Sequence, residues 1–206
     1  MDLSKIKGLY EDSLAKHGRS PESVGWTKPG SQEMRFDKLL SVVDPKDEGF
    51  DVNELGCGYG ELLPYAISQG YKLKGFDGYD ISEKMIEQAK DHLAAYEQVN
   101  LYVDSAIHHK RDYTITSGIF NVKFEQSEDK WKEFIFQTLE MMMDNSNKGI
   151  AFNLLTSYVD FTVDHLFYAD PMEFFDHCKR NLSKRVTLIH DYPLYEWTMI
   201  VRKDEA

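Results

Sequence analysis

Three glycines at alternate positions follow a short strand-like segment, and no other feature of this chain constrains its fold as strongly. Residues 50–55 read FDVNEL, and Gly56, Gly58 and Gly60 come directly after them. In α/β proteins, a strand that ends in a glycine-rich turn and opens into a helix brings backbone close to a nucleotide-like ligand. Glycine is needed there because a side chain would block the approach and because the turn adopts backbone angles that other residues avoid. The segment therefore predicts a strand, a turn and a helix, with a ligand over the turn.

The spacing of the glycines limits the choice of ligand. A dinucleotide-binding fingerprint, G-x-G-x-x-G, would require glycine at position 61, where this chain has Glu61. A phosphate-binding loop of the Walker type would require a lysine followed by serine or threonine, which the turn lacks. The spacing therefore counts against a nicotinamide-dependent oxidoreductase and against a Walker-type nucleotide-hydrolysing enzyme.

Strands and helices alternate after residue 50, which is typical of a mostly parallel sheet covered on both faces. The pattern predicts an α/β fold with a doubly wound, mostly parallel, seven-stranded sheet that ends in an antiparallel β-hairpin. We expect residues 1–49 to form a helical preface and residues 50–206 the main domain. Strands are expected at 50–55, 71–79, 99–103, 112–120, 148–155, 185–190 and 196–201, and helices at 4–17, 31–43, 62–70, 82–96, 131–143 and 171–182. Ser31 and Ser82 are expected to cap the second and the fourth of these helices.

The charge and composition bound the class of function. The chain has 206 residues and a formal net charge of -11, which argues against broad nucleic-acid binding because that relies on Lys and Arg to neutralise phosphates. The two cysteines form neither a disulfide framework nor a zinc site. No apolar run is long enough to cross a membrane, and the charged N-terminus has no signal-like segment. We therefore expect a soluble cytoplasmic protein.

The segment from Glu54 to Gly60 has the form E-x-G-x-G-x-G, which resembles motif I of the class I S-adenosylmethionine (SAM) dependent methyltransferases. The resemblance extends over roughly residues 50–202, and a sheet that closes with an antiparallel hairpin is what this family shows. One departure is Asn53, a polar residue where most members have an apolar one. The resemblance implies a Rossmann-like fold, SAM as cofactor and S-adenosylhomocysteine (SAH) as product.

The resemblance also implies a backbone cradle at the turn for the methionine half of SAM. Glu54 would lie near the positively charged amino end of the cofactor. The cradle would comprise Gly56, Cys57, Gly58 and Gly60, with Cys57 as a small residue that fills space inside the turn. The alternative is a tight strand-to-helix turn without a ligand.

An acidic residue about 20 positions beyond the turn is the expected acceptor of the ribose hydroxyls, because a carboxylate takes two hydrogen bonds from a vicinal diol. Asp80 fits this position, and Asp77 competes with it. We favour Asp80 because it directly precedes Ile81 and Ser82, and this D-I-S ending resembles the family's second motif. Asp80 also fits a solvated loop carboxylate. Ile81 and Met85 would flank the adenine, although both are ordinary core residue types.

Two further segments would complete the cofactor site on the family's pattern. Asp104, Ser105 and Ala106 follow the third strand, where the resemblance implies contacts to the adenine amino group and ring. Ser117 and Gly118 lie toward the end of the fourth predicted strand, beside the expected position of the sulfonium. The segment from Asp104 to Ala106 also fits an ordinary loop.

The preface supplies weaker candidates. In this family, aromatic and arginine residues ahead of the first strand often close over SAM. Trp26 and Arg35 match that description, with Arg35 meeting the cofactor's carboxylate, and Tyr10 is a further aromatic candidate. Arg35 fits a surface helix residue equally well.

The implied reaction is an in-line attack of an acceptor heteroatom on the SAM methyl group. The acidic charge and short length favour a small-molecule acceptor, such as a sugar or another metabolite that offers a hydroxyl oxygen. The family's N-methyltransferase signature, Asn or Asp followed by Pro-Pro and an aromatic residue, is absent, and no metal-ligand cluster stands out. His190 is our candidate for a general base, with a structural histidine as the alternative. The rival functions are a SAM-binding regulatory module without transfer activity and, less favoured, a nicotinamide-dependent oxidoreductase.

Overall fold

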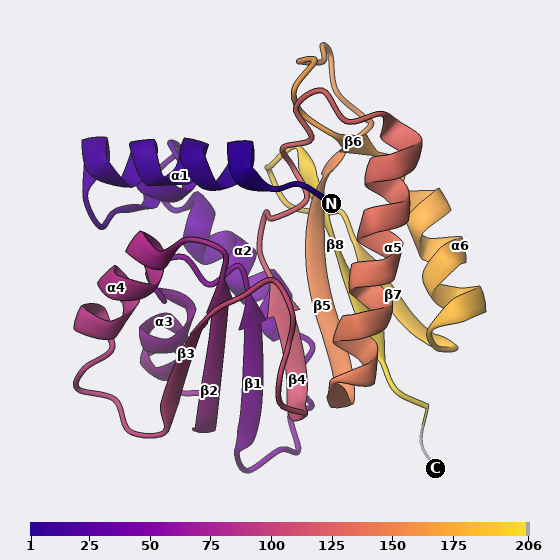
Figure 1. Cartoon of the computed structure of the whole chain (residues 1–206). Helices are drawn as coiled ribbons and strands as arrows, with labels where there is room; N and C mark the ends of the chain where they lie inside the picture. The colour runs from indigo at the N-terminus through magenta and orange to yellow at the C-terminus, as the bar shows by residue number, and fades with distance from the viewer. Residues whose placement is uncertain (205–206) are drawn as a thin grey trace.

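The protein is built around one eight-stranded sheet, described here from a computed structural model that covers residues 1–204. The strand order is β3-β2-β1-β4-β5-β8-β7, with β6 paired to β5 (Figure 1). Strands β1 to β5 pair in parallel, and β8 runs antiparallel to both β5 and β7. The strands are β1 (Phe50–Leu55), β2 (Leu73–Asp80), β3 (Val99–Val103), β4 (Arg111–Thr116), β5 (Ser146–Thr156), β6 (Tyr168–Ala169), β7 (Arg185–Ile189) and β8 (Glu196–Arg202).

This architecture confirms the predicted fold class, a doubly wound and mostly parallel sheet that ends in an antiparallel hairpin. The eighth strand, β6, was not predicted because it has only two residues, which is too short for any periodicity to show. The last two residues of the predicted 50–206 domain, positions 205–206, lie outside the described residues.

Helices cover both faces of the sheet, as a parallel sheet requires. One apolar cluster joins α2, α3 and α4 to the strands, and a second joins α5 and α6 to the opposite face. The helices are α1 (Ser4–His17), α2 (Ser31–Leu40), α3 (Leu62–Ser68), α4 (Glu83–His92), α5 (Glu128–Asp144) and α6 (Pro171–Asn181), with a short 3₁₀ helix η1 (Pro21–Val24). In the part of the chain that is described, no helix combines the length and apolar character needed to cross a bilayer.

Several element ends differ from the sequence prediction. The fourth strand ends at Thr116 rather than at residue 120, because the chain turns at Gly118, whose φ is 75°. Helix α2 ends at Leu40 and α4 at His92, each shorter than predicted. The prediction that Ser31 caps α2 is wrong. Gly30 is the N-cap residue, with its backbone in the left-handed region, and no side-chain hydrogen bond caps the helix.

The predicted cap of α4 is confirmed. Ser82 lies at the N-cap, and its Oγ accepts a hydrogen bond from the backbone N–H of Met85 at 3.2 Å. This bond satisfies one of the donors that a helix N-terminus otherwise leaves unpaired.

We expect Ser82→Ala to lower the free energy of unfolding by about 1 kcal/mol, the usual cost of removing a capping side chain. Urea denaturation measures this change. Ser127→Ala is the matched control, because Ser127 is the N-cap residue of α5 but its side chain makes no capping bond. Equal losses in the two variants would contradict the capping role of Ser82.

Candidate cofactor site

A cavity opens at the carboxyl ends of β1, β2 and β4, where the strand order reverses between β1 and β4. Such a switch point is where open α/β sheets bind their ligands. The cavity encloses about 1090 Å³ of space that no protein atom fills, open solvent at its mouth included. Its walls come from the glycine turn, the ends of β2 and β4, helix α5 and the preface.

The glycine turn is held against the end of β2 by backbone hydrogen bonds. Gly56 N–H and Cys57 N–H both donate to the carbonyl of Tyr79, at 2.7 and 3.0 Å, and Gly58 N–H donates to Asp80 Oδ2 at 2.9 Å. Gly56 has a φ of 74° and Gly58 a φ of 54°, in the left-handed region that favours glycine. Gly56, Cys57 and Gly58 all line the cavity.

Gly60 serves packing in this structure. It does not line the cavity, and a Cβ at this position would lie 2.7 Å from Cδ1 of Leu93. The third glycine therefore lets the start of α3 approach the end of α4, and it has no direct contact with the ligand space.

Glu54 brings to the cavity wall a buried carboxylate oxygen that has no partner in the described part of the chain. The residue is 3 % exposed, and its Oε2 has no hydrogen-bond partner among the described residues. Burial raises the pKa of this carboxyl well above its ordinary value, and the nearby charges of Asp80 and Glu61 add to the effect. A buried carboxylate oxygen without a partner is costly, so the site is suited to a ligand that brings a positive charge.

The two acidic candidates on β2, Asp77 and Asp80, lie in different surroundings. Asp80 lines the cavity, where its carboxylate accepts from the N–H groups of Gly58 and Ser82, both at 2.9 Å. Asp77 is fully buried outside the cavity and pairs with Arg111, at 2.9 Å to Nε and 2.7 Å to Nη2. The lone pairs of Asp77 are thus engaged by the protein, whereas Asp80 faces the ligand space.

The remaining sequence candidates divide into two groups. Ile81, Met85, Asp104, Ser105, Ser117 and Gly118 line the cavity. Ala106 does not, and its N–H donates to Asp104 Oδ1 at 2.9 Å, which closes a turn behind the wall.

Arg35 is engaged by protein groups in this structure. It does not line the cavity, and its side chain is 7 % exposed. Its Nε donates to Glu196 Oε2 at 2.8 Å, and its Nη1 donates to the carbonyl of Ser31 at 2.7 Å. The guanidinium is therefore committed to protein partners, and the expected contact with a cofactor carboxylate is absent from this arrangement.

His190 is not among the residues that line the cavity. It follows the end of β7, is exposed, and its ring centroid lies 5.8 Å from that of Tyr158. The structure thus does not bring the predicted general base to the cavity.

The preface covers the cavity. Ile6, Lys7 and Tyr10 line it from α1, and Leu3 lines it from the position just before that helix. The spacing of these residues is that of one helix face. Burial raises the pKa of Tyr10 to about 12, so its hydroxyl remains protonated at neutral pH. Trp26 and Tyr10, the aromatic candidates of the preface, therefore both reach the ligand space.

Sequence reasoning missed the contributions of two helices. Gln32 and Phe36 reach the cavity from α2, and Phe134 and Thr138 from α5. The apolar periodicity of both helices indicates buried faces, but only the packing of those faces on the sheet decides which residues meet the cavity.

Comparison with known proteins assigns the chain to a family. A scan against models of protein families found no match. The chain is 40% identical over 168 residues to "Putative methyltransferase Rv1506c" of Mycobacterium tuberculosis, which covers 81% of this chain and 98% of that protein. The chain therefore belongs to the methyltransferases.

Solved structures share the fold at low sequence identity. Magnesium protoporphyrin IX methyltransferase from Synechocystis PCC 6803 with bound SAH has a TM-score of 0.68 and 16% identity, covering 98% of this chain and 100% of that chain. The N-methyltransferase NodS from Bradyrhizobium japonicum WM9 with SAH has a TM-score of 0.66 and 11% identity, covering 96% and 99%. Their identities are too low to indicate more than the fold.

Proposed function

We propose that this methyltransferase acts on a small-molecule acceptor and that the attacking atom is a hydroxyl oxygen, as in a sugar or another metabolite. The net charge of -11 supports a small acceptor over a nucleic acid, whose phosphates would be repelled. The missing N-methyltransferase signature supports oxygen over nitrogen. The structural neighbours include an N-methyltransferase, so the acceptor atom must be tested directly.

The cofactor position that we infer rests on one observation, the unpartnered Oε2 of buried Glu54 in the cavity wall. An ammonium group there would supply the missing partner and the opposite charge. From this anchor, the turn at Gly56 and Gly58 would hold the methionine half and Asp80 the ribose diol. Ile81, Met85, Asp104 and Ser105 would enclose the adenine, and Ser117 and Gly118 would lie beside the sulfonium. SAM supplies an electrophilic methyl group on that sulfonium, which the acceptor oxygen attacks in line.

The protein's contribution to rate would be alignment and exclusion of water. Helix α1 covers the cavity, and none of the described residues that line it is a histidine. Holding two reactants in line accounts for about 7–11 kcal/mol of barrier lowering in favourable cases, so a dedicated base is not required.

His190→Ala is therefore expected to keep turnover within about tenfold of the wild type. A general base would contribute about 10²–10⁴-fold, and an exposed ring outside the cavity lacks the required contact. Initial rates with an identified acceptor measure this. A loss in the general-base range, together with a rate that falls as pH drops through ~6.5, would restore His190 as the base.

The acceptor itself is found by incubating the protein with labelled SAM and fractionated metabolite extract, followed by mass spectrometry of the labelled product. Label in a small molecule, on oxygen, supports the proposal. Label on nitrogen overturns the choice of atom, and label in added RNA or protein overturns the small-molecule class. SAH binding without turnover on any fraction would support a regulatory module.

The raised pKa of Glu54 predicts proton release on binding. Between its ordinary value of 4.5 and the raised folded value, the free protein holds Glu54 protonated, and an ammonium ligand favours the charged form. The contribution of Glu54 to the free energy of unfolding is fully present below pH 4.5, and it is lost as the pH rises through the pKa of Glu54 in the folded protein. In that window, SAH binding should release up to about one proton, measured by calorimetry in buffers of different ionisation enthalpy. Equal release by Glu54→Gln would contradict the assignment.

A further inference from the structure

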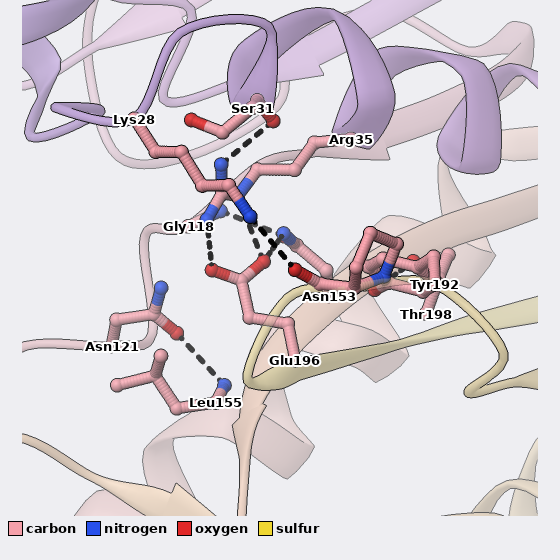
Figure 2. A network of polar contacts seen from close by, with 11 residues as sticks. Lys28, Ser31, Arg35, Gly118, Asn121, Asn153, Leu155, Tyr192, Glu196 and Thr198 are labelled. Carbon is pink, nitrogen blue, oxygen red and sulfur yellow. Dashed lines mark hydrogen bonds and ion pairs between the residues drawn. The ribbon is translucent and has the colours of Figure 1, made fainter.

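A buried ion pair lies behind the cavity wall without touching the ligand space. Arg35 of α2 and Glu196 of β8 have side chains that are 7 % and 2 % exposed. Their contact is two-pronged: Nε of Arg35 donates to Oε2 of Glu196 at 2.8 Å, and Nη2 donates to Oε1 (Figure 2). Neither residue lines the cavity. Removing one member of such a pair leaves an uncompensated buried charge, so the pair strongly fixes its surroundings.

Two routes lead from this ion pair to the cavity wall. Along the first, Asn153 of β5 donates from Nδ2 to Glu196 Oε2 at 2.8 Å and accepts from Gly118 N–H at 2.8 Å through Oδ1. Asn153, Glu196 and Gly118 are labelled in Figure 2. Gly118 lines the cavity. The buried charge pair is thereby linked, through one amide side chain, to the backbone of the wall.

The second route runs through an aromatic ring. The guanidinium carbon of Arg35 lies 3.6 Å from the ring centroid of Trp26, which also lines the cavity. The Trp26 ring then packs on Gly118 so closely that a Cβ there would lie 2.6 Å from it. Planar stacking and a two-pronged carboxylate contact are geometries that arginine provides and lysine does not. The contacts therefore form a closed ring of residues, which runs from Arg35 through Glu196, Asn153 and Gly118 to Trp26 and back to Arg35.

We propose that Arg35, Glu196 and Asn153 are positioning residues that fix Gly118 and Trp26 as the wall of the cofactor site. This inference rests on the proposed cofactor position, because it assigns the wall a ligand to hold. It also gives Arg35 a function that does not require contact with the cofactor. Loosening the ring should let the Gly118 turn and the indole move, and the site should bind its ligand less tightly.

The test measures SAH affinity by calorimetry in variants that keep the buried charges balanced. Arg35→Met combined with Glu196→Leu removes both charges together, a replacement that often leaves stability unchanged. We expect this double variant and Asn153→Ala each to weaken SAH binding about 5- to 150-fold, the usual range of coupling between linked sites. When the double variant is combined with Asn153→Ala, the fold-loss of SAH affinity should be smaller than the product of the two separate fold-losses. Both changes open the same ring of contacts, so their effects are not independent.

The matched control is the other two-pronged pair, Asp77 with Arg111, which lies outside the cavity. Arg111→Met combined with Asp77→Leu should leave SAH affinity unchanged. If the Arg35 and Glu196 double variant folds and binds SAH like the wild type, or if the control pair weakens binding equally, the positioning role is wrong and the ring is only structural.

Hydrogen exchange in the ligand-free protein tests the positioning role independently of where the cofactor binds. Hydrogen exchange of the Gly118 amide should accelerate in the Arg35 and Glu196 double variant and remain unchanged in the control pair. Unchanged exchange at Gly118 overturns the inference even if SAH binds. Wild-type protein that fails to bind SAH overturns the cofactor position, while faster exchange at Gly118 would still establish the link from the ion pair to the wall.

Discussion

Gly58→Val is expected to weaken SAH binding by about 100-fold or more, equivalent to ~3 kcal/mol. Gly58 lines the cavity with a φ of 54°, and a Cβ at this position would lie 3.2 Å from Cγ1 of Val24. The two methyl groups of valine would project from a turn in which even one added carbon lies in tight contact with Val24. Overpacking of a filled site typically costs about 1–3 kcal/mol, which is the size of the affinity loss expected here. Calorimetry on the folded variant measures the affinity.

Gly70→Val is the matched control for this substitution. Gly70 has a φ of 87°, so valine meets the same kind of backbone strain, but a Cβ there has nothing within 4 Å. This variant should lose stability and keep its SAH affinity. Unchanged affinity in a folded Gly58→Val protein would show that the ligand does not lie over the turn.

Asp80→Ala should cost about 1.5–3 kcal/mol of SAH binding, the range for hydrogen bonds to a charged group, or about one to two decades in affinity. The carboxylate faces the cavity and also holds the N–H of Gly58 at 2.9 Å. Its removal therefore takes away the proposed ribose acceptor and loosens the turn that holds the methionine half. Calorimetry with SAH measures the loss.

Asp77→Ala is the comparison for that result. Asp77 pairs with Arg111 and also accepts from Asn100 Nδ2 at 2.8 Å, outside the cavity. Its loss should lower the free energy of unfolding, because Arg111 loses its two-pronged partner and keeps, among the described residues, only the ion pair with Asp51, at 4.0 Å. The affinity should change much less than in Asp80→Ala. The reverse ranking of the two affinities would overturn the assignment of the ribose to Asp80.

The features that the sequence predicted well are local ones. The glycine turn, Glu54 and Asp80 lie within one stretch of strand, turn, helix and strand, so spacing alone places them at one edge of a parallel sheet. The cap at Ser82 is similarly local, because the capping bond joins residues three positions apart. These elements needed no knowledge of how distant parts of the chain pack.

The features that the sequence did not predict depend on long-range contacts. Arg35 was expected at the cofactor, but its partner Glu196 lies 161 positions away, and no spacing rule links the two. The cavity residues of α5 depend on how that helix packs on the sheet. Asn53, which departs from the family's pattern, donates from Nδ2 to the carbonyl of His109 at 2.9 Å, and so it anchors the β3–β4 connection behind the site.

The central claim is that SAM binds in the cavity between the glycine turn, Glu54 and Asp80. A crystal structure of the protein with SAH tests it most directly. The account predicts the amino group of SAH within hydrogen-bond distance of Glu54, about 2.7–3.2 Å, and both ribose hydroxyls on Asp80. SAH bound elsewhere on the protein, or bound in this cavity with its ribose away from Asp80 and its amino group away from Glu54, would contradict it.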